Sequence, residues 1–190
     1  MKSLIILHGL GKGPADEWYQ SIAEIGKMKG FKSFVPKLPT SFKPNLEQTY
    51  NFILKNFQLD SNTTLIGHSS GATLILGILQ KLPPEILINK VILVACPIDP
   101  FLTDLLHKYV PRQDYADLFP SAWDWNKIKR SAKRFVILYS DNDPYVQPRH
   151  ATEIYSRIGG QLIEMPGYGH FGINTGGEKL KDFVELIKYL

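Results

Sequence analysis

Apolar residues follow two alternating patterns along this chain, and these predict alternating strands and helices. Short apolar or β-branched runs bounded by Gly, Pro or polar turn residues are typical of strands, and longer stretches with helical spacing are typical of amphipathic helices. The runs predict strands at residues 3–8, 32–38, 63–67, 90–96, 134–140 and 161–165. The helical spacing predicts helices at residues 16–29, 45–56, 70–82, 148–158 and 177–190.

The predicted strands are apolar almost throughout, which indicates a sheet that is buried on both faces. The runs LIIL, VILVA and FVIL show no polar alternation, as expected for a mostly parallel sheet covered by helices on either side. We therefore expect an α/β fold, a three-layer α/β/α sandwich with a six-stranded, mostly parallel sheet. Sheets of this kind carry their sites at the carboxyl ends of the strands, so the residues directly after each run are the informative ones.

One segment, 99–126, breaks this alternation and is too apolar to be a linker. Its apolar residues include Phe101, Leu102, Leu105, Leu106, Tyr109, Tyr115, Phe119, Trp123 and Trp125. We expect a short helical excursion over the strand ends, where it would form one wall of a pocket. Packing against the main core is an equally weighted alternative.

Length and composition indicate one ordinary domain covering residues 1–190. A chain of 190 residues buries roughly 70 % of its unfolded surface without needing disulfides or metals. The single cysteine, Cys96, excludes an intrachain disulfide and a multi-cysteine zinc site. The N-terminal apolar run is too short for a signal peptide, and no run approaches the ~20 residues that span a bilayer. We expect a cytoplasmic protein, and the sequence leaves its oligomeric state open.

The net charge of +4 is modest, and the basic residues carry no nucleic-acid-reading motif. The densest basic run is Lys127, Lys129, Arg130, Lys133 and Arg134. We interpret this run as a solvated helix face in preference to an anion-binding patch, because mixed charge on an exposed helix needs no partner. No nucleic-acid partner is expected.

The stretch LIGHSSG places Ser69 in a G-x-S-x-G pattern between a predicted strand and a predicted helix. In a strand-turn-helix elbow the serine takes a strained backbone conformation, and glycines at 67 and 71 relieve the crowding around it. Ser69 is the candidate nucleophile. The helix expected from Ser70 would aim its free N–H groups at a developing oxyanion, so Ser70 is expected to contribute its amide and not its hydroxyl.

The glycine-rich stretch HGLGKG follows the first predicted strand. It does not fit a nucleotide fingerprint, because Pro14 occupies the last position of a G-x-G-x-x-G pattern that begins at Gly9 and the P-loop signature is missing. We interpret it as the source of the second oxyanion donor, the amide of Leu10. No nucleotide or other cofactor is expected.

An acid and a base for Ser69 are found further along the chain. Asp143, in SDNDPYV after the fifth predicted strand, is the preferred acid; Asp141 is interpreted as a turn residue and Asp99 is a more distant choice. His170, in GYGHFG after the last predicted strand, is the candidate base. The chain order Ser, Asp, His is that of one particular hydrolase architecture.

The other four histidines are interpreted without a catalytic role. His107 and His150 are expected at the surface, while His8 and His68 are expected to make structural hydrogen bonds beside the site. None forms an H-E-x-x-H pair, and no calcium loop or cysteine cluster is present in the sequence, so we expect no metal.

The segments LIILHGLGKGP, LIGHSSGA, SDNDPYV and GYGHFG resemble the α/β-hydrolase superfamily. Together with the chain length they resemble its small serine hydrolases, the family of retinoblastoma-binding protein nine and YdeN-like proteins, over nearly the whole chain. The resemblance implies a minimal α/β-hydrolase fold with a triad of Ser69, Asp143 and His170. Retinoblastoma binding through an L-x-C-x-E peptide is not carried over, because Leu93 lies three residues before Cys96 and Ile98 replaces the glutamate.

The resemblance implies hydrolysis of an ester-like or amide-like acyl bond through an acyl-enzyme on Ser69, with a small-molecule acyl substrate. A carboxylesterase is the leading hypothesis. A thioesterase or acyltransferase of the same fold remains an alternative, as does a non-catalytic protein-binding module that uses the aromatic segment 99–126. Dehalogenase chemistry is disfavoured, because it needs a carboxylate where this chain has Ser69.

Overall fold

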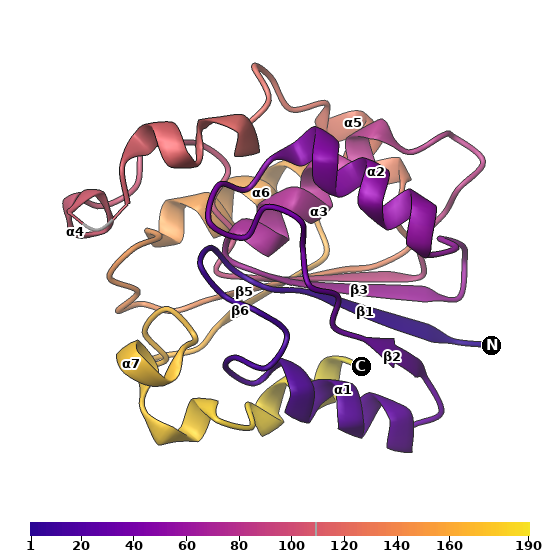
Figure 1. Ribbon diagram of the computed structural model, residues 1–190, viewed down its shortest axis with the longest axis horizontal. Helices are drawn as coiled ribbons and strands as arrows, with labels where there is room; N and C mark the ends of the chain where they lie inside the picture. Colours follow the sequence, from indigo (N-terminus) through magenta and orange to yellow (C-terminus); the bar gives the residue numbers. More distant parts are fainter. Residues whose placement is uncertain (109) are drawn as a thin grey trace.

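The computed structural model describes residues 1–108 and 110–190; Tyr109, one of the aromatic residues noted above, lies outside the described residues. Six strands form one sheet in the order β2-β1-β3-β4-β5-β6, and every pair of neighbours is parallel (Figure 1). The strands are β1 Ser3–Leu7, β2 Lys32–Phe34, β3 Thr63–His68, β4 Lys90–Val94, β5 Phe135–Tyr139 and β6 Gln161–Glu164. The expected α/β fold is confirmed, with a sheet that is wholly parallel.

Helices cover both faces of the sheet, as Figure 1 shows. One face carries α2 Leu46–Asn56, α3 Ser70–Lys81, α5 Trp125–Arg130 and α6 Pro148–Ile158, and the other carries α1 Tyr19–Met28 and the C-terminal segments. Successive strand residues point to opposite faces. Accordingly, Ile5 belongs to the core under α3, whereas Leu4 and Ile6 belong to the core under α1.

Local sequence features explain where α2 and α6 begin and which face of α1 is buried. In α2 the side chain of Asn45 accepts a hydrogen bond from the Gln48 amide at 2.9 Å, which satisfies one of the free donors of the first turn. Helix α6 begins with Pro148, a residue that suits the first helical position. Helix α1 buries residues 19, 22, 23 and 26, the spacing of a single helical face.

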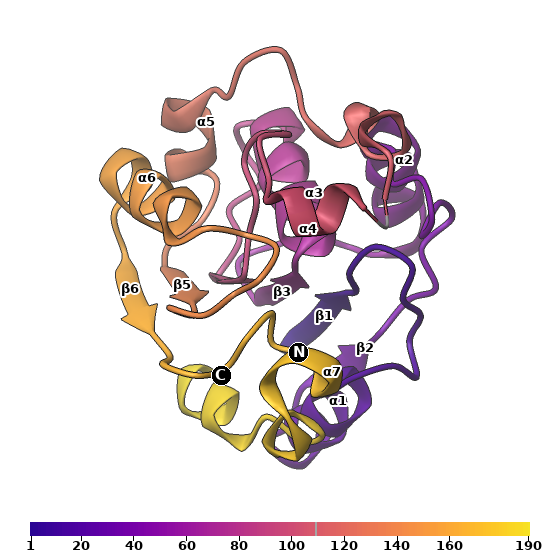
Figure 2. The same cartoon turned by 90° about the vertical axis from the view of Figure 1, so that its left-hand side faces the viewer.

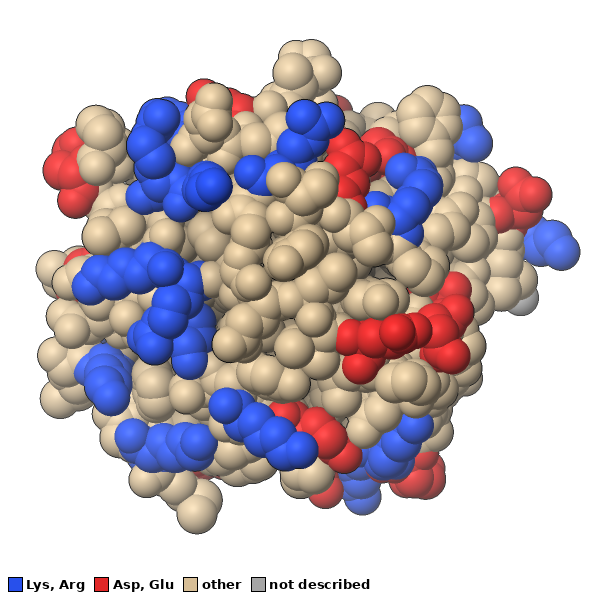
Figure 3. All heavy atoms as spheres, turned by 180° about the vertical axis from the view of Figure 1, so that it is seen from behind, with Lys and Arg blue, Asp and Glu red and all other residues tan. Residues whose placement is uncertain are grey.

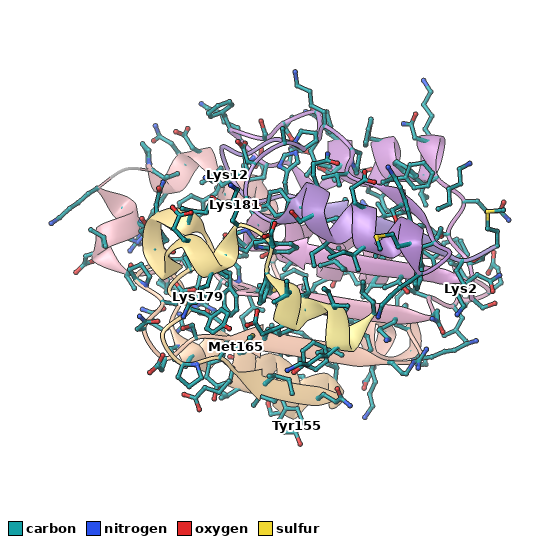
Figure 4. All side chains as sticks on the ribbon, turned by 90° about the horizontal axis from the view of Figure 1, so that it is seen from below. Lys2, Lys12, Tyr155, Met165, Lys179 and Lys181 are labelled. Atoms are coloured by element: carbon teal, nitrogen blue, oxygen red, sulfur yellow. The ribbon has the colours of Figure 1, made fainter. Side chains whose placement is uncertain are left out.

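The helix expected over residues 177–190 is wrong. This segment forms two 3₁₀ turns, Glu178–Leu180 and Val184–Tyr189, separated by Phe183 with a left-handed φ of 43°. The buried side chains are Leu180, Phe183 and Leu186, which recur every three residues. The chain changes direction at Phe183, and all three side chains reach the core on this face of the sheet. Figure 4, from below, shows α1 and these C-terminal segments side by side.

In the described part of segment 99–126 the chain forms three short helices before α5 begins at Trp125: α4 Asp104–His107, η1 Arg112–Asp114 and η2 Ala116–Leu118. Figure 2 looks onto the carboxyl ends of the strands and shows α4 in front of them. Leu102 and Tyr115 form a small cluster with Val146 beside the strand ends, while Leu118 is buried in the main core.

A short helix that was not expected, α7 Ile173–Gly176, follows β6. None of the helices in the described residues is long and apolar enough to cross a membrane.

Candidate active site

Ser69 lies on a sharp turn between β3 and α3. Its backbone has φ 54° and ψ −123°, a conformation that a non-glycine residue adopts only when its surroundings enforce it. A Cβ at Gly67 would meet the backbone of Gly71 and Ala72, and a Cβ at Gly71 would meet the carbonyl oxygens of Leu7 and His8. The two glycines therefore allow the tight strand-turn-helix path that the sequence pattern predicts.

The structure brings Ser69, His170 and Asp143 together from three strand ends. His170 Nε2 lies 2.9 Å from Ser69 Oγ, and His170 Nδ1 lies 2.7 Å from Asp143 Oδ2. The Asp143 side chain is 2 % exposed and that of His170 is 14 % exposed. A carboxylate can only accept, so Nδ1 carries the hydrogen of that bond and Nε2 is free to accept from the Ser69 hydroxyl.

Backbone amides fix the carboxylate of Asp143. Its Oδ1 accepts from the amides of Tyr145 at 2.8 Å and Val146 at 3.0 Å. Oδ2 is thereby left for His170. The ring of Tyr145 also packs edge-on against the imidazole of His170, with centroids 5.2 Å apart.

The two other acids considered from the sequence lie elsewhere. Asp141 Oδ1 accepts from the amide of Gly167 at 2.8 Å, so it binds the loop before His170. Asp99 forms an ion pair with Arg149 at 2.7 Å. Neither carboxylate hydrogen-bonds His170 in the described residues.

The loop that carries His170 is held by the turn after β5. Asn142 Oδ1 accepts from the amide of Gly169 at 2.8 Å, and Ser140 Oγ accepts from that of Tyr168 at 3.0 Å. Together with Asp141, three consecutive polar side chains bind three consecutive amides of this loop. The sequence predicted no role for Asn142 or Ser140, although their position directly after a strand is the available signal.

The loop after β1 approaches Ser69 closely. A Cβ at Gly9 would lie 3.4 Å from Ser69 Cβ. Leu10 and Ser70 both line the cavity beside Ser69, and within the described part of the chain neither amide donates a hydrogen bond. Two free N–H donors next to a serine hydroxyl are what an oxyanion site requires.

A cavity of about 500 Å³ opens beside Ser69 and is lined mainly by apolar side chains. Segment 99–126 supplies most of this wall: Leu102, Leu106, Val110, Pro111, Tyr115, Leu118 and Phe119. Lys43 and Asp114 also line the cavity and form an ion pair at 3.0 Å. A cavity of this size and composition suits a small apolar ligand.

The histidine expectations hold for two residues and fail for one. His8 and His68 are buried beside the site and make hydrogen bonds, His8 through its Nε2 to the amide of Leu38 at 3.2 Å. His150, expected at the surface, is fully buried, and its Nδ1 accepts from the amide of Ile98 at 3.3 Å. His107 is half-buried. Burial lowers the pKa of His68 to about 3 and that of His150 to about 4.

Segment Glu17–Tyr19 contacts the site, which the sequence pattern did not indicate. Trp18 and Tyr19 are fully buried, and Tyr19 Oη lies 2.7 Å from His68 Nδ1. Burial by itself would raise the pKa of Glu17, but Lys12 and the amide of Ile173 hold it below its ordinary value. The available signal was a Glu-Trp-Tyr run directly after a glycine-rich loop.

The described residues give little support to Cys96 as a second nucleophile or to a metal site. Burial raises the pKa of the Cys96 thiol, which keeps it protonated and unreactive. Among the described residues, no three His, Cys, Asp or Glu side chains gather as a metal site would need.

The basic run noted in the sequence lies near the amino-terminal ends of the strands, and Figure 3 shows Lys and Arg gathered on that side of the back face. Three of its members line a groove of about 410 Å³ whose described lining holds no Asp or Glu; the cations in this lining are Lys90, Lys129, Lys133, Arg134 and Lys188. The carboxyl end of α6, at Ile158, also reaches this groove. Cations near a helix carboxyl end complement its dipole, so the charge needs no ligand to explain it.

Comparisons with known proteins identify the family of this chain. The family model described as "Serine hydrolase" matches residues 4–188. YdeN of Bacillus subtilis is 26% identical over 172 residues, covering 90% of this chain and 86% of YdeN. Serine hydrolase RBBP9 of Rattus norvegicus is 25% identical over 187 residues, covering 97% of this chain and 91% of the relative.

Solved structures show the same fold. The crystal structure of YdeN covers 100% of this chain and 98% of its own, with a TM-score of 0.84 at 23% identity. The carboxylesterase CesB from Bacillus subtilis gives a TM-score of 0.66 at 16% identity, covering 97% of this chain and 82% of its own. Because the family model spans nearly the whole sequence, the chain belongs to the serine hydrolase family, within the α/β-hydrolase superfamily.

Proposed function

We propose that this serine hydrolase is a carboxylesterase that cleaves small esters with an apolar acyl group through an acyl-enzyme on Ser69. The observation that carries the proposal is the unbroken line of hydrogen bonds from Ser69 Oγ through His170 to Asp143, at 2.9 and 2.7 Å. A serine hydroxyl is a weak nucleophile unless a base lies within hydrogen-bond reach and is itself oriented. Here His170 lies within hydrogen-bond reach of Ser69, and Asp143 hydrogen-bonds the other nitrogen of the His170 ring.

In the proposed mechanism Ser69 Oγ attacks the ester carbonyl while His170 Nε2 takes its proton. Asp143 holds the tautomer of His170 and stabilises the imidazolium, and the amides of Leu10 and Ser70 donate to the oxyanion. Collapse of the tetrahedral intermediate expels the alcohol, which takes the proton from His170. Water then attacks the acyl-enzyme by the same route, releasing the acid and restoring Ser69.

The apolar wall of the cavity supports the choice of acyl group. Leu102, Leu118 and Phe119 line the space beside Ser69, and each buried methylene of a substrate is worth about 0.8 kcal/mol, or about fourfold in kcat/KM. The name of CesB, a carboxylesterase of the same fold, is in keeping with this substrate class.

The first test is labelling with a fluorophosphonate, read by intact mass and peptide mapping. Wild type should carry one adduct on Ser69, and Ser69→Ala and His170→Ala should carry none. An unlabelled, folded wild type would refute the catalytic proposal and favour a protein-binding role.

The second test is a series of p-nitrophenyl esters from acetate to octanoate, with matched thioesters. We expect kcat/KM to rise with acyl length until the cavity is filled. Leu106→Trp, which narrows the cavity, should lower kcat/KM for the longer esters more than for acetate. A preference for thioesters, or no dependence on acyl length, would overturn the proposed substrate class.

A further inference from the structure

A buried chain of hydrogen bonds joins the loop after β1 to the backbone of His170. The amide of Gly9 donates to Tyr19 Oη at 3.3 Å, Tyr19 Oη lies 2.7 Å from His68 Nδ1, and His68 Nε2 lies 2.8 Å from the carbonyl oxygen of His170. Tyr19 is 0% exposed and His68 is 3% exposed. We call these two side chains the Tyr19–His68 link. It spans the proposed oxyanion loop, the residue before the nucleophile, and the base.

The chemistry at its two ends fixes the direction of every hydrogen bond in the link. A backbone amide can only donate and a carbonyl can only accept, so His68 Nε2 must carry a hydrogen. Burial lowers the pKa of His68 to about 3, so the ring is neutral and its Nδ1 accepts from the Tyr19 hydroxyl. Burial raises the pKa of Tyr19, which keeps that hydroxyl protonated. One arrangement of hydrogens satisfies the whole link.

The two residues before Tyr19 bind the same loops. Trp18 Nε1 donates to the carbonyl oxygen of Phe171 at 2.9 Å. Glu17 accepts from the amide of Ile173 at 3.0 Å and pairs with Lys12 at 2.6 Å; Lys12 is labelled in Figure 4, near the C-terminal segments. Glu17 and Phe171 have positive φ values of 53° and 52°. Non-glycine residues keep such angles only where neighbouring contacts enforce them.

We propose that Tyr19 and His68 are positioning residues, which hold the base His170 and the oxyanion loop at a fixed separation on either side of Ser69. This inference rests on the proposed function of the same site. His68 also stays neutral, with its ring centroid 5.1 Å from that of His170. A charged neighbour there would oppose the imidazolium that His170 forms during acyl transfer.

The test variant is Tyr19→Phe, which keeps the ring and removes the hydroxyl. Both the Gly9 amide and His68 Nδ1 lose a buried partner, so the loops relax from their fixed positions. We expect kcat to fall about 10- to 100-fold, the loss typical of a displacement near 1 Å. KM should change less than about threefold, because Tyr19 does not line the cavity. Fluorophosphonate labelling of Ser69 should slow in parallel.

Tyr50→Phe is the matched control, because it removes the same atom far from the site. The Tyr50 hydroxyl donates to the carbonyl oxygen of Lys81 at 3.3 Å, and its loss should leave kcat unchanged. If Tyr19→Phe remains folded by circular dichroism and keeps kcat within about twofold of wild type, the positioning role is refuted.

A pair of variants at His68 separates hydrogen bonding from packing. Gln offers both an acceptor and a donor and can replace part of the link, whereas Leu offers neither. We expect His68→Gln to retain at least about tenfold more kcat than His68→Leu when both are folded. Equal losses in kcat would show that His68 acts only by filling space.

Nuclear magnetic resonance of ¹⁵N-histidine-labelled protein tests the link without relying on turnover. His68 should be neutral with its hydrogen on Nε2, and Tyr19→Phe should shift the ring nitrogens of both His68 and His170, whereas Tyr50→Phe should shift neither. Unchanged His170 signals in Tyr19→Phe would refute the link. An unlabelled Ser69 in wild type would instead refute the proposed function, and the resonance measurement would still decide whether the link holds His170.

Discussion

Asp143→Asn tests the proposed orienting role of this carboxylate with a change of one atom. Asp143 Oδ1 accepts from two backbone amides, at 2.8 and 3.0 Å, and Oδ2 accepts from His170 Nδ1 at 2.7 Å. An asparagine must keep its oxygen toward the two amides, because turning it would set N–H against N–H at both contacts. Its NH₂ group therefore faces His170 Nδ1.

This arrangement predicts a large loss in kcat. The NH₂ group can only donate, so Nδ1 becomes an acceptor and the imidazole hydrogen moves to Nε2, which faces Ser69 Oγ. The ring can no longer take the serine proton. The same change in another Ser-His-Asp enzyme lowers kcat about 10⁴-fold, equivalent to about 5.4 kcal/mol of transition-state stabilisation. KM should change less than about threefold, because Asp143 does not line the apolar cavity.

Steady-state hydrolysis of a p-nitrophenyl ester and the rate of fluorophosphonate labelling both measure this loss. Asp141→Asn is the matched control: Asp141 Oδ1 accepts from the Gly167 amide at 2.8 Å, a role that an asparagine oxygen can take over. We expect its kcat within about threefold of wild type. Retention of more than a tenth of kcat in Asp143→Asn, or an equal loss in Asp141→Asn, would refute the assignment.

Three further predictions concern stability and reactivity. Gly71→Ala should lower the free energy of unfolding by about 1–3 kcal/mol or more in urea titrations, because the new methyl group meets the carbonyl oxygens of Leu7 and His8; an unchanged midpoint would contradict this packing. The pKa values of His68 and His150, about 3 and about 4 when folded, lie below the unfolded value of 6.5, so their stabilisation is complete above pH 6.5. Between pH 6.5 and 4 the free energy of unfolding should fall by up to about 2.7 kcal/mol per pH unit from the two histidines together. Urea midpoints should show this decrease, and His150→Gln should make the slope of stability against pH shallower. Cys96 is 2 % exposed and should react with a thiol reagent only on unfolding, so rapid modification of the folded protein would contradict its burial.

The sequence predicted the strands and the elbow because their signals are local. A strand followed by G-x-S-x-G and an apolar helix is compatible with few structures other than a strand-turn-helix elbow. Ser69, Asp143 and His170 each follow a predicted strand, so their order along the chain can also be read from the sequence. The structure places His170 within hydrogen-bond distance of both Ser69 and Asp143. Their catalytic roles remain a proposal that the labelling experiment tests.

Two predictions, the helix over residues 177–190 and the exposure of His150, were wrong because the local pattern is compatible with more than one environment. In residues 177–190 the apolar positions 180, 183 and 186 are compatible with one face of an α-helix, and this pattern carries no signal for the left-handed turn at Phe183 that divides the segment. His150 follows Pro148 in the first turn of α6, where a histidine is ordinarily exposed. Here the ring is buried, and its Nδ1 accepts from the amide of Ile98, a distant partner that the local pattern does not reveal.

The Tyr19–His68 link was hidden for a different reason. Hydrophobic periodicity counts Tyr19 as a core residue of the helix that begins there, and the structure agrees, since the ring is fully buried. Phenylalanine at the same position would give the same periodicity. The hydroxyl is what differs: a buried tyrosine needs a partner for it, and here the partner is the histidine next to the candidate nucleophile. In small parallel α/β proteins, a tyrosine or tryptophan directly after the first glycine-rich loop is therefore a residue whose polar atom can reach the site, even where the pattern assigns it to the core.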